Sequence, residues 1–82
     1  MTIEQQTKLN QLVDQFASDA DVIEMVQSIE SSAPTTQNHY GRYLVALQQI
    51  CKDKITMYVM AHAMIKVGAN RDGIASALRI IG

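Results

Sequence analysis

The sequence predicts an all-α protein, a compact bundle of four to five short helices with a central apolar helix at about residues 54–67. Apolar residues recur at intervals of three and four along most of the chain, which is the period of an amphipathic helix. The alternation of apolar and polar residues that marks a strand is not seen. The 82 residues are enough for a single helical domain, residues 1–82.

The first helix is expected from about Ile3 to Ala17. Thr2 and Gln5 have the spacing of a capping box, in which each side chain accepts a hydrogen bond from the other residue's backbone amide. The apolar positions follow the spacing of one buried stripe: Leu9, Leu12, Val13 and Phe16.

The second helix is expected from about Ala20 to Ser31, with Ser18 or Asp19 as its cap. It offers a short apolar edge to the core: Val22, Ile23, Val26 and Ile29. The polar segment that follows ends the helix, because Pro34 disfavours helical backbone at the preceding residue.

The third helix is expected from about Gln37 to Lys52, capped by Thr35 or Thr36. It has the clearest division into an apolar and a polar side. The predicted core side contains Tyr40, Tyr43, Leu44, Leu47, Ile50 and Cys51. The predicted solvent side contains Asn38, Gly41, Arg42, Gln49 and Lys52.

The fourth helix is expected from about Lys54 to Val67, capped by Asp53 and ended by Gly68. One side is apolar through Met57, Met60, Ala61, Met64 and Val67. Most of the remaining circumference is apolar too, through Ile55, Tyr58, Val59, Ala63 and Ile65. A helix that is apolar nearly all round is buried nearly all round, so this helix should lie at the centre.

The fifth helix is expected from about Arg71 to Ile81, with Asn70 as its cap. Its buried stripe should consist of Ile74, Ala77, Leu78 and Ile81.

Composition excludes several ways of stabilising or locating so small a protein. Cys51 is the only cysteine, so no disulfide can form within the chain. His39 and His62 stand far apart, without the ligand spacing of a metal site, and no metal or cofactor is expected. No apolar run reaches the roughly 20 residues that span a bilayer, and the N-terminal residues lack the pattern of a signal peptide. A cytoplasmic location follows as the simplest expectation.

Charge is distributed unevenly between the two halves of the chain. Residues 1–34 contain six acidic residues and one lysine, a net charge of −5, whereas residues 35–82 contain six basic and two acidic residues, a net charge of +4. The two halves can attract each other within one molecule or between two copies.

The second apolar side of residues 54–67 is the predicted self-association interface. The short surrounding helices cannot cover it completely, and an exposed apolar patch commonly marks an interface. The residues assigned to this interface are Ile55, Tyr58, Val59, His62, Ile65 and Lys66. A symmetric dimer is the first expectation for the oligomer.

An anion or nucleotide site is a possible alternative at the start of the third helix. Asn38, His39 and Arg42 place amide, imidazole and guanidinium groups near a helix N-terminus, where anions bind. The competing interpretation is that Tyr40 and Tyr43 belong to an aromatic part of the core and that the polar residues surround it.

The last two helices offer a DNA-binding alternative, because a helix, a glycine turn and a second helix resemble a helix-turn-helix. Arg71, Ser76 and Arg79 would then face the DNA. The chain as a whole is not basic, with a net charge of −1, which argues against nucleic acid as the partner.

Other reactive residue types have simple structural interpretations. The methionines at positions 57, 60 and 64 fit a core stripe better than an adaptable binding groove. Cys51 fits a buried, inert thiol, and His62 lacks a nucleophile or an orienting carboxylate that the sequence can identify.

The sequence therefore favours a small, non-enzymatic protein-interaction module that self-associates and binds another macromolecule, a protein partner first of all. A DNA-binding regulator and a small-ligand or nucleotide-binding oligomer remain the alternatives.

Overall fold

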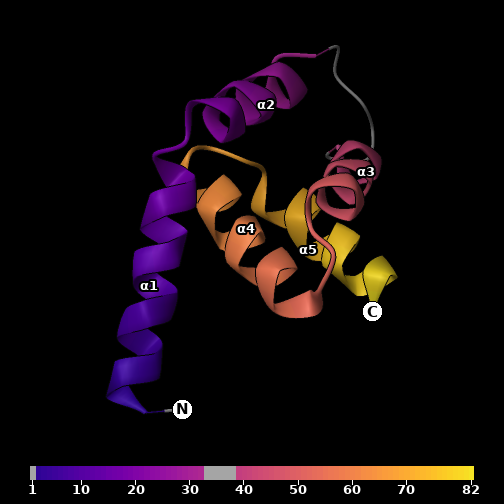
Figure 1. Cartoon of the computed structure of the whole chain (residues 1–82). Coiled ribbons are helices and arrows are strands. Elements are labelled where there is room, and N and C mark those ends of the chain that lie inside the picture. Colours follow the sequence, from indigo (N-terminus) through magenta and orange to yellow (C-terminus); the bar gives the residue numbers. More distant parts are fainter. Residues whose placement is uncertain (1, 33–38) are drawn as a thin grey trace.

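The computed structural model describes residues 2–32 and 39–82, and this part of the chain is all-α. Its five helices are α1 (Ile3–Ala17), α2 (Ala20–Glu30), α3 (Tyr40–Ile50), α4 (Lys54–Lys66) and α5 (Arg71–Ile81) (Figure 1). None of these described helices combines the length and the apolar character needed to cross a membrane.

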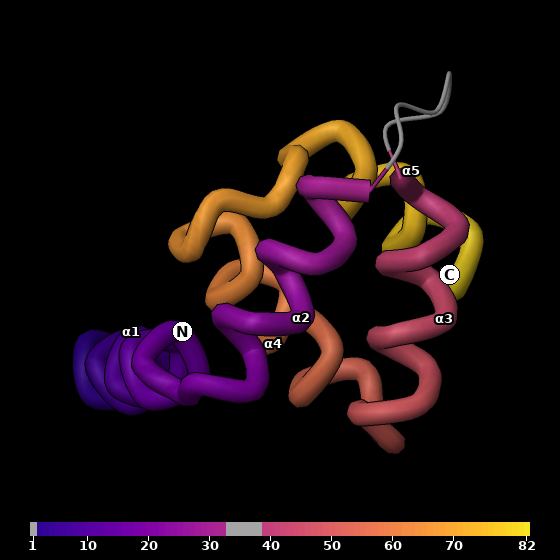
Figure 2. Tube along the Cα trace, turned by 90° about the horizontal axis from the view of Figure 1, so that it is seen from above, coloured from indigo at the N-terminus to yellow at the C-terminus, as the bar shows by residue number. Residues whose placement is uncertain are grey.

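Helix α4 lies at the centre of the arrangement, as the sequence predicts. It packs against each of the other four helices, with α1 on one side and the closely packed pair α3 and α5 on the other (Figure 2). Helix α2 contacts both α1 and α4. The chain therefore wraps around its most apolar helix, although α1 runs beyond the body of the molecule at its N-terminal end (Figure 1).

The core forms where α2, α3, α4 and α5 meet. Its largest fully buried side chains are Val26, Tyr43, Leu47, Cys51, Met64 and Ile74. Met60 and Met64 of α4 are buried and Met57 is half-buried, so the methionine stripe fills core as predicted. The predicted core edge of α2 is also confirmed, because Val22, Val26 and Ile29 are buried.

The predicted caps hold four of the helices in place. Thr2 and Gln5 form the reciprocal capping box of α1. The Asp19, Asp53 and Asn70 side chains accept hydrogen bonds from first-turn amides of α2, α4 and α5 respectively. Gly68 has a φ of 108°, a left-handed conformation that suits the residues directly after α4.

The expected buried stripe of α1 is wrong. None of the residues of α1 is buried, and Leu12 remains 41% exposed. The physical reason is that α1 packs against α4 and α2 from the outside, so water reaches both flanks of its contact line.

The expected bounds of the third helix are also wrong. Helix α3 begins at Tyr40, because His39 has a left-handed backbone with a φ of 63°, and it ends at Ile50. Cys51 adopts extended backbone, which turns its own side chain into the core and leaves Ile50 47% exposed. Ala46 is buried in the place expected for Ile50. The proposed caps Thr35 and Thr36 lie outside the described residues.

Candidate interaction site

The main surface feature is an open groove of about 990 Å³ between α1 and α4, which Arg71 also lines. Its α1 wall consists of Gln6, Leu9, Asn10, Val13 and Asp14. Its α4 floor consists of Ile55, Tyr58, Val59, His62, Ile65 and Lys66. We call this feature the α1–α4 groove.

The α4 floor contains all six residues that the sequence assigns to self-association. They share one side of α4 because they recur at intervals of three and four. These six residues differ in how far they are buried. Val59 is buried, whereas Ile55 is 70% exposed and Tyr58 is 51% exposed. Water therefore reaches two large apolar side chains on the floor of the groove.

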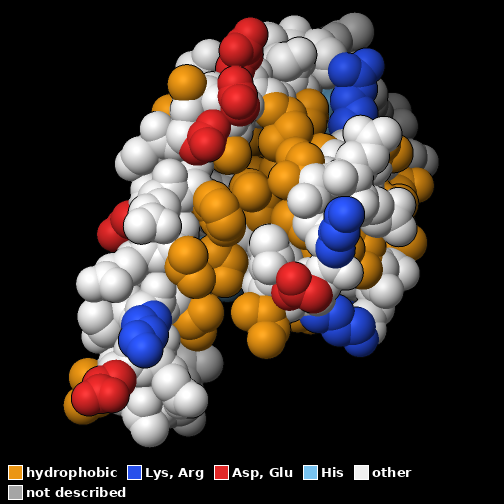
Figure 3. Space-filling model, in the orientation of Figure 1, with side chains coloured by type: hydrophobic (Ala, Val, Ile, Leu, Met, Phe, Trp, Pro, Cys, Tyr) orange, Lys and Arg blue, Asp and Glu red, His pale blue; other side chains and the backbone are white. Residues whose placement is uncertain are grey.

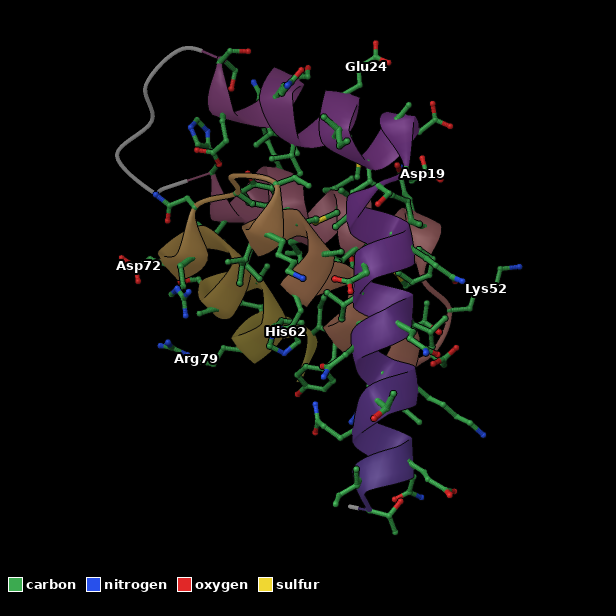
Figure 4. The ribbon with its side chains drawn as sticks, turned by 90° about the vertical axis from the view of Figure 1, so that its left-hand side faces the viewer. Asp19, Glu24, Lys52, His62, Asp72 and Arg79 are labelled. Carbon is green, nitrogen blue, oxygen red and sulfur yellow. The ribbon has the colours of Figure 1, made fainter. Side chains whose placement is uncertain are left out.

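Polar side chains surround this apolar floor. The Lys66 ammonium donates a hydrogen bond to the Asp14 carboxylate and forms an ion pair with it, which links α4 to α1. On the same wall, the Gln6 amide nitrogen donates to the Asn10 side-chain oxygen at 3.1 Å. His62 is exposed and lies beside α1 in the side view (Figure 4). An apolar floor with a polar rim is the anatomy of a protein interface.

Sequence reasoning missed the α1 wall, and it assigned Arg71 to the DNA-binding alternative rather than to this groove. The sequence identifies the exposed side of α4 from its own periodicity, but it contains no signal for which helix lies beside that side. The Asp14–Lys66 ion pair joins residues 52 positions apart in the chain. The opposite charges of the two halves were the one hint that such a pair could form.

The predicted anion site at the start of the third helix is only partly described. Asn38 lies outside the described residues, His39 is half-buried and Arg42 is exposed. The nearby Tyr43 is fully buried, and its hydroxyl donates a hydrogen bond to the Glu30 carboxylate. A carboxylate at this position disfavours a bound anion, and the aromatic core interpretation accounts for Tyr43.

The Glu30 carboxylate connects three segments. Its Oε2 atom accepts from the Tyr43 hydroxyl and, at 3.0 Å, from the Asn70 backbone amide that precedes α5. Burial raises the pKa of the Tyr43 phenol, and the hydrogen bond to Glu30 and the negative charge of Glu30 raise it further. Tyr43 is therefore a neutral hydrogen-bond donor within the core.

Burial likewise raises the pKa of the Cys51 thiol, with a further contribution from the charge of Asp53. A buried thiol with a raised pKa is a poor nucleophile, in agreement with the inert role predicted for Cys51. Within residues 2–32 and 39–82, no three His, Cys, Asp or Glu side chains are grouped so that they could hold a metal ion.

The three residues of the DNA-binding alternative do not form one exposed basic surface. Arg71 lines the α1–α4 groove and Ser76 is half-buried. Arg79 is exposed, but Asp72 lies seven residues earlier and therefore on the same side of α5. The side view shows Asp72 and Arg79 projecting from the same flank of the molecule (Figure 4).

Comparison of the chain with protein-family models, with curated proteins and with solved structures found no match in any of the three.

Proposed function

We propose that this protein is a non-enzymatic interaction module that self-associates through the α1–α4 groove and, in the assembled form, binds another macromolecule. The observation that carries the proposal is the exposure of Ile55 and Tyr58 on the floor of an open groove. Leaving such side chains in water is unfavourable, and burying a large apolar side chain contributes roughly 1.5–3 kcal/mol.

A second copy of the chain is the occupant that the charges favour. Helix α1 contains two acidic residues and one lysine, whereas α4 contains two lysines and no acidic residue. In a twofold dimer each copy contributes the same surface, so α1 of one copy can lie beside α4 of the other. Outside the Asp14–Lys66 pair, α1 still has Glu4 and α4 still has Lys54, so this arrangement can bring one acidic and one basic residue together on each side of the symmetry axis.

Ile55→Glu tests the proposal, because this side chain is exposed and its replacement disturbs no packing within one molecule. We expect the wild-type chain to contain at least two copies per particle at high micromolar concentration in light scattering. Ile55→Glu should lower the measured mass. The matched control is Ile80→Glu, which changes an equally apolar, 57% exposed residue outside the groove and should leave the mass unchanged.

A monomeric wild-type chain would exclude self-association. A mass that Ile55→Glu does not lower would exclude the groove as the interface.

A further inference from the structure

A second exposed apolar surface lies on the side of the molecule opposite the groove. Met57 is two positions from both groove residues Ile55 and Val59, so it points away from the groove on α4, and Leu12 is not among the α1 residues that line the groove. Figure 3 shows this side of the molecule, where apolar side chains gather along the middle of the face between α1 and α2 on one flank and α3 on the other. We call this surface the apolar strip.

The side chains around the strip are only partly covered. Leu12 is 41% exposed. Each of four helices contributes a half-buried apolar residue that packs against the core: Phe16, Met25, Leu44 and Met57. The strip is therefore a continuation of the core to the surface rather than a set of isolated apolar side chains.

The two edges of the strip have opposite charges. Acidic side chains follow the α2 edge, whereas lysine and arginine side chains, with one acidic side chain among them, follow the α3 edge (Figure 3). The exposed acidic residues in and directly before α2 are Asp19, Asp21 and Glu24. The exposed basic residues in and directly after α3 are Arg42 and Lys52. In the side view, Asp19 and Lys52 project toward the same side (Figure 4).

This charge pattern is complementary to itself. When two copies face each other about a twofold axis parallel to the strip, the α2 edge of each copy meets the α3 edge of the other. An axis across the strip would instead place like charges together, which costs free energy. The charges on the two edges thus favour a second copy of the chain as the partner and a twofold axis parallel to the strip as its orientation.

We propose that the apolar strip binds a second copy of this chain about a twofold axis parallel to the strip, with Asp21 and Glu24 of each copy paired with Arg42 of the other. The observations behind this interface are separate from those behind the groove. The two surfaces lie on opposite sides of α4, so both can be occupied at once, and the full assembly then exceeds a dimer.

The test uses Ile55→Glu as the parent, since this substitution removes the groove contact. One derivative carries Asp21→Lys and Glu24→Lys, which gives both edges of the strip a net positive charge while the capping residue Asp19 is retained. A second derivative carries Arg42→Glu and Lys52→Glu, which makes both edges acidic. A control derivative carries Asp72→Lys and Arg79→Glu, which reverses charges on α5 instead. Circular dichroism of each variant establishes that the helices are retained.

Sedimentation velocity should show a dimeric parent and a dimeric control, whereas each strip derivative alone should have half that mass. Mixing the two strip derivatives should restore a dimer, because a strip whose edges are both net positive then meets a strip whose edges are both net negative. Where a reversal variant does not fold, Asp21→Asn with Glu24→Gln removes the charges more gently and should weaken the dimer.

A monomeric parent, strip derivatives that stay dimeric, or a mixture that stays monomeric would each overturn the strip interface. A different result tests the groove. If the Ile55→Glu parent has the same mass as the wild-type chain, the groove is not an interface.

Discussion

Tyr43 connects three parts of the chain through one buried hydroxyl. The side chain is fully buried, and its hydroxyl donates to the Glu30 carboxylate, which also accepts from the Asn70 amide. Buried polar groups are stable only when they are hydrogen-bonded, so these contacts fix how α2, α3 and the start of α5 approach one another.

Removing this hydroxyl should destabilise the fold. Tyr43→Phe keeps the buried ring but deletes the donor to a charged carboxylate, and the expected loss in the free energy of unfolding is about 2 kcal/mol. Urea denaturation measures the loss. Tyr58→Phe is the control, because Tyr58 is 51% exposed and its substitution should change stability by less than about 0.5 kcal/mol. Equal stability of the two variants would contradict the structural role of the Glu30 contact.

Alkaline pH should lower the free energy of unfolding through the same tyrosine. The pKa of Tyr43 is raised in the folded chain, so above about pH 10 the unfolded chain loses its phenolic proton first and the free energy of unfolding falls as the pH rises. The raised pKa of Cys51 acts in the same direction from about pH 8.5. Tyr43→Phe removes the first contribution only, so the stability of this variant should fall less steeply than that of the wild-type chain between about pH 10 and 11.

The five helices differ in how firmly tertiary contacts hold them. Helix α4 packs against every other helix and has five buried residues. Helix α1 has none, and its Asp14–Lys66 ion pair joins two exposed side chains. Exposed ion pairs of this kind contribute about 0–1 kcal/mol to the free energy of unfolding. The position of α1 therefore depends on its capping box and on apolar contacts that remain partly exposed to water.

Hydrogen exchange should separate these two helices. Amides in the N-terminal half of α1 should exchange through local opening with low protection, whereas amides of α4 should exchange only when the whole domain unfolds. Thr2→Ala should accelerate exchange in α1 and leave α4 unchanged, since it removes the cap of α1 alone. Equal protection of α1 and α4, measured at a dilution at which the wild-type chain is monomeric, would mean that α1 is part of the same cooperative unit.

The whole molecule combines an apolar core with a marked separation of charge. The acidic first half supplies α1 and α2, and the basic second half supplies α3, α4 and α5. The molecule consequently carries a groove with one exposed apolar floor and, on the opposite side, a strip with one acidic and one basic edge.

Salt should distinguish these two surfaces. At 1 M ionic strength the Debye length is about 3 Å, so attraction between the edges of two strips is screened, whereas apolar burial in the groove persists. We expect the wild-type assembly to lose mass between low salt and 1 M salt and to stop at the groove-linked dimer. Light scattering across a salt series measures this change, and the Ile55→Glu parent should go to monomer over the same range. An assembly whose mass is independent of salt would contradict the paired edges.

The sequence by itself determined the all-α class, the central place of α4, the caps at Thr2, Asp19, Asp53 and Asn70, and the six residues on the α4 floor. These features depend on periodicity and on contacts within one turn of helix, so neighbouring residues are enough to specify them. Tertiary structure alone decided that α1 lies beside α4 with no buried residue, that Ile50 stays 47% exposed while Ala46 is buried, and that Glu30 joins Tyr43 to Asn70. Those outcomes depend on how whole helices pack. Several helices have apolar faces of similar length, so each face could pack against more than one other helix. Only the packing of all five helices together decides which of these contacts form.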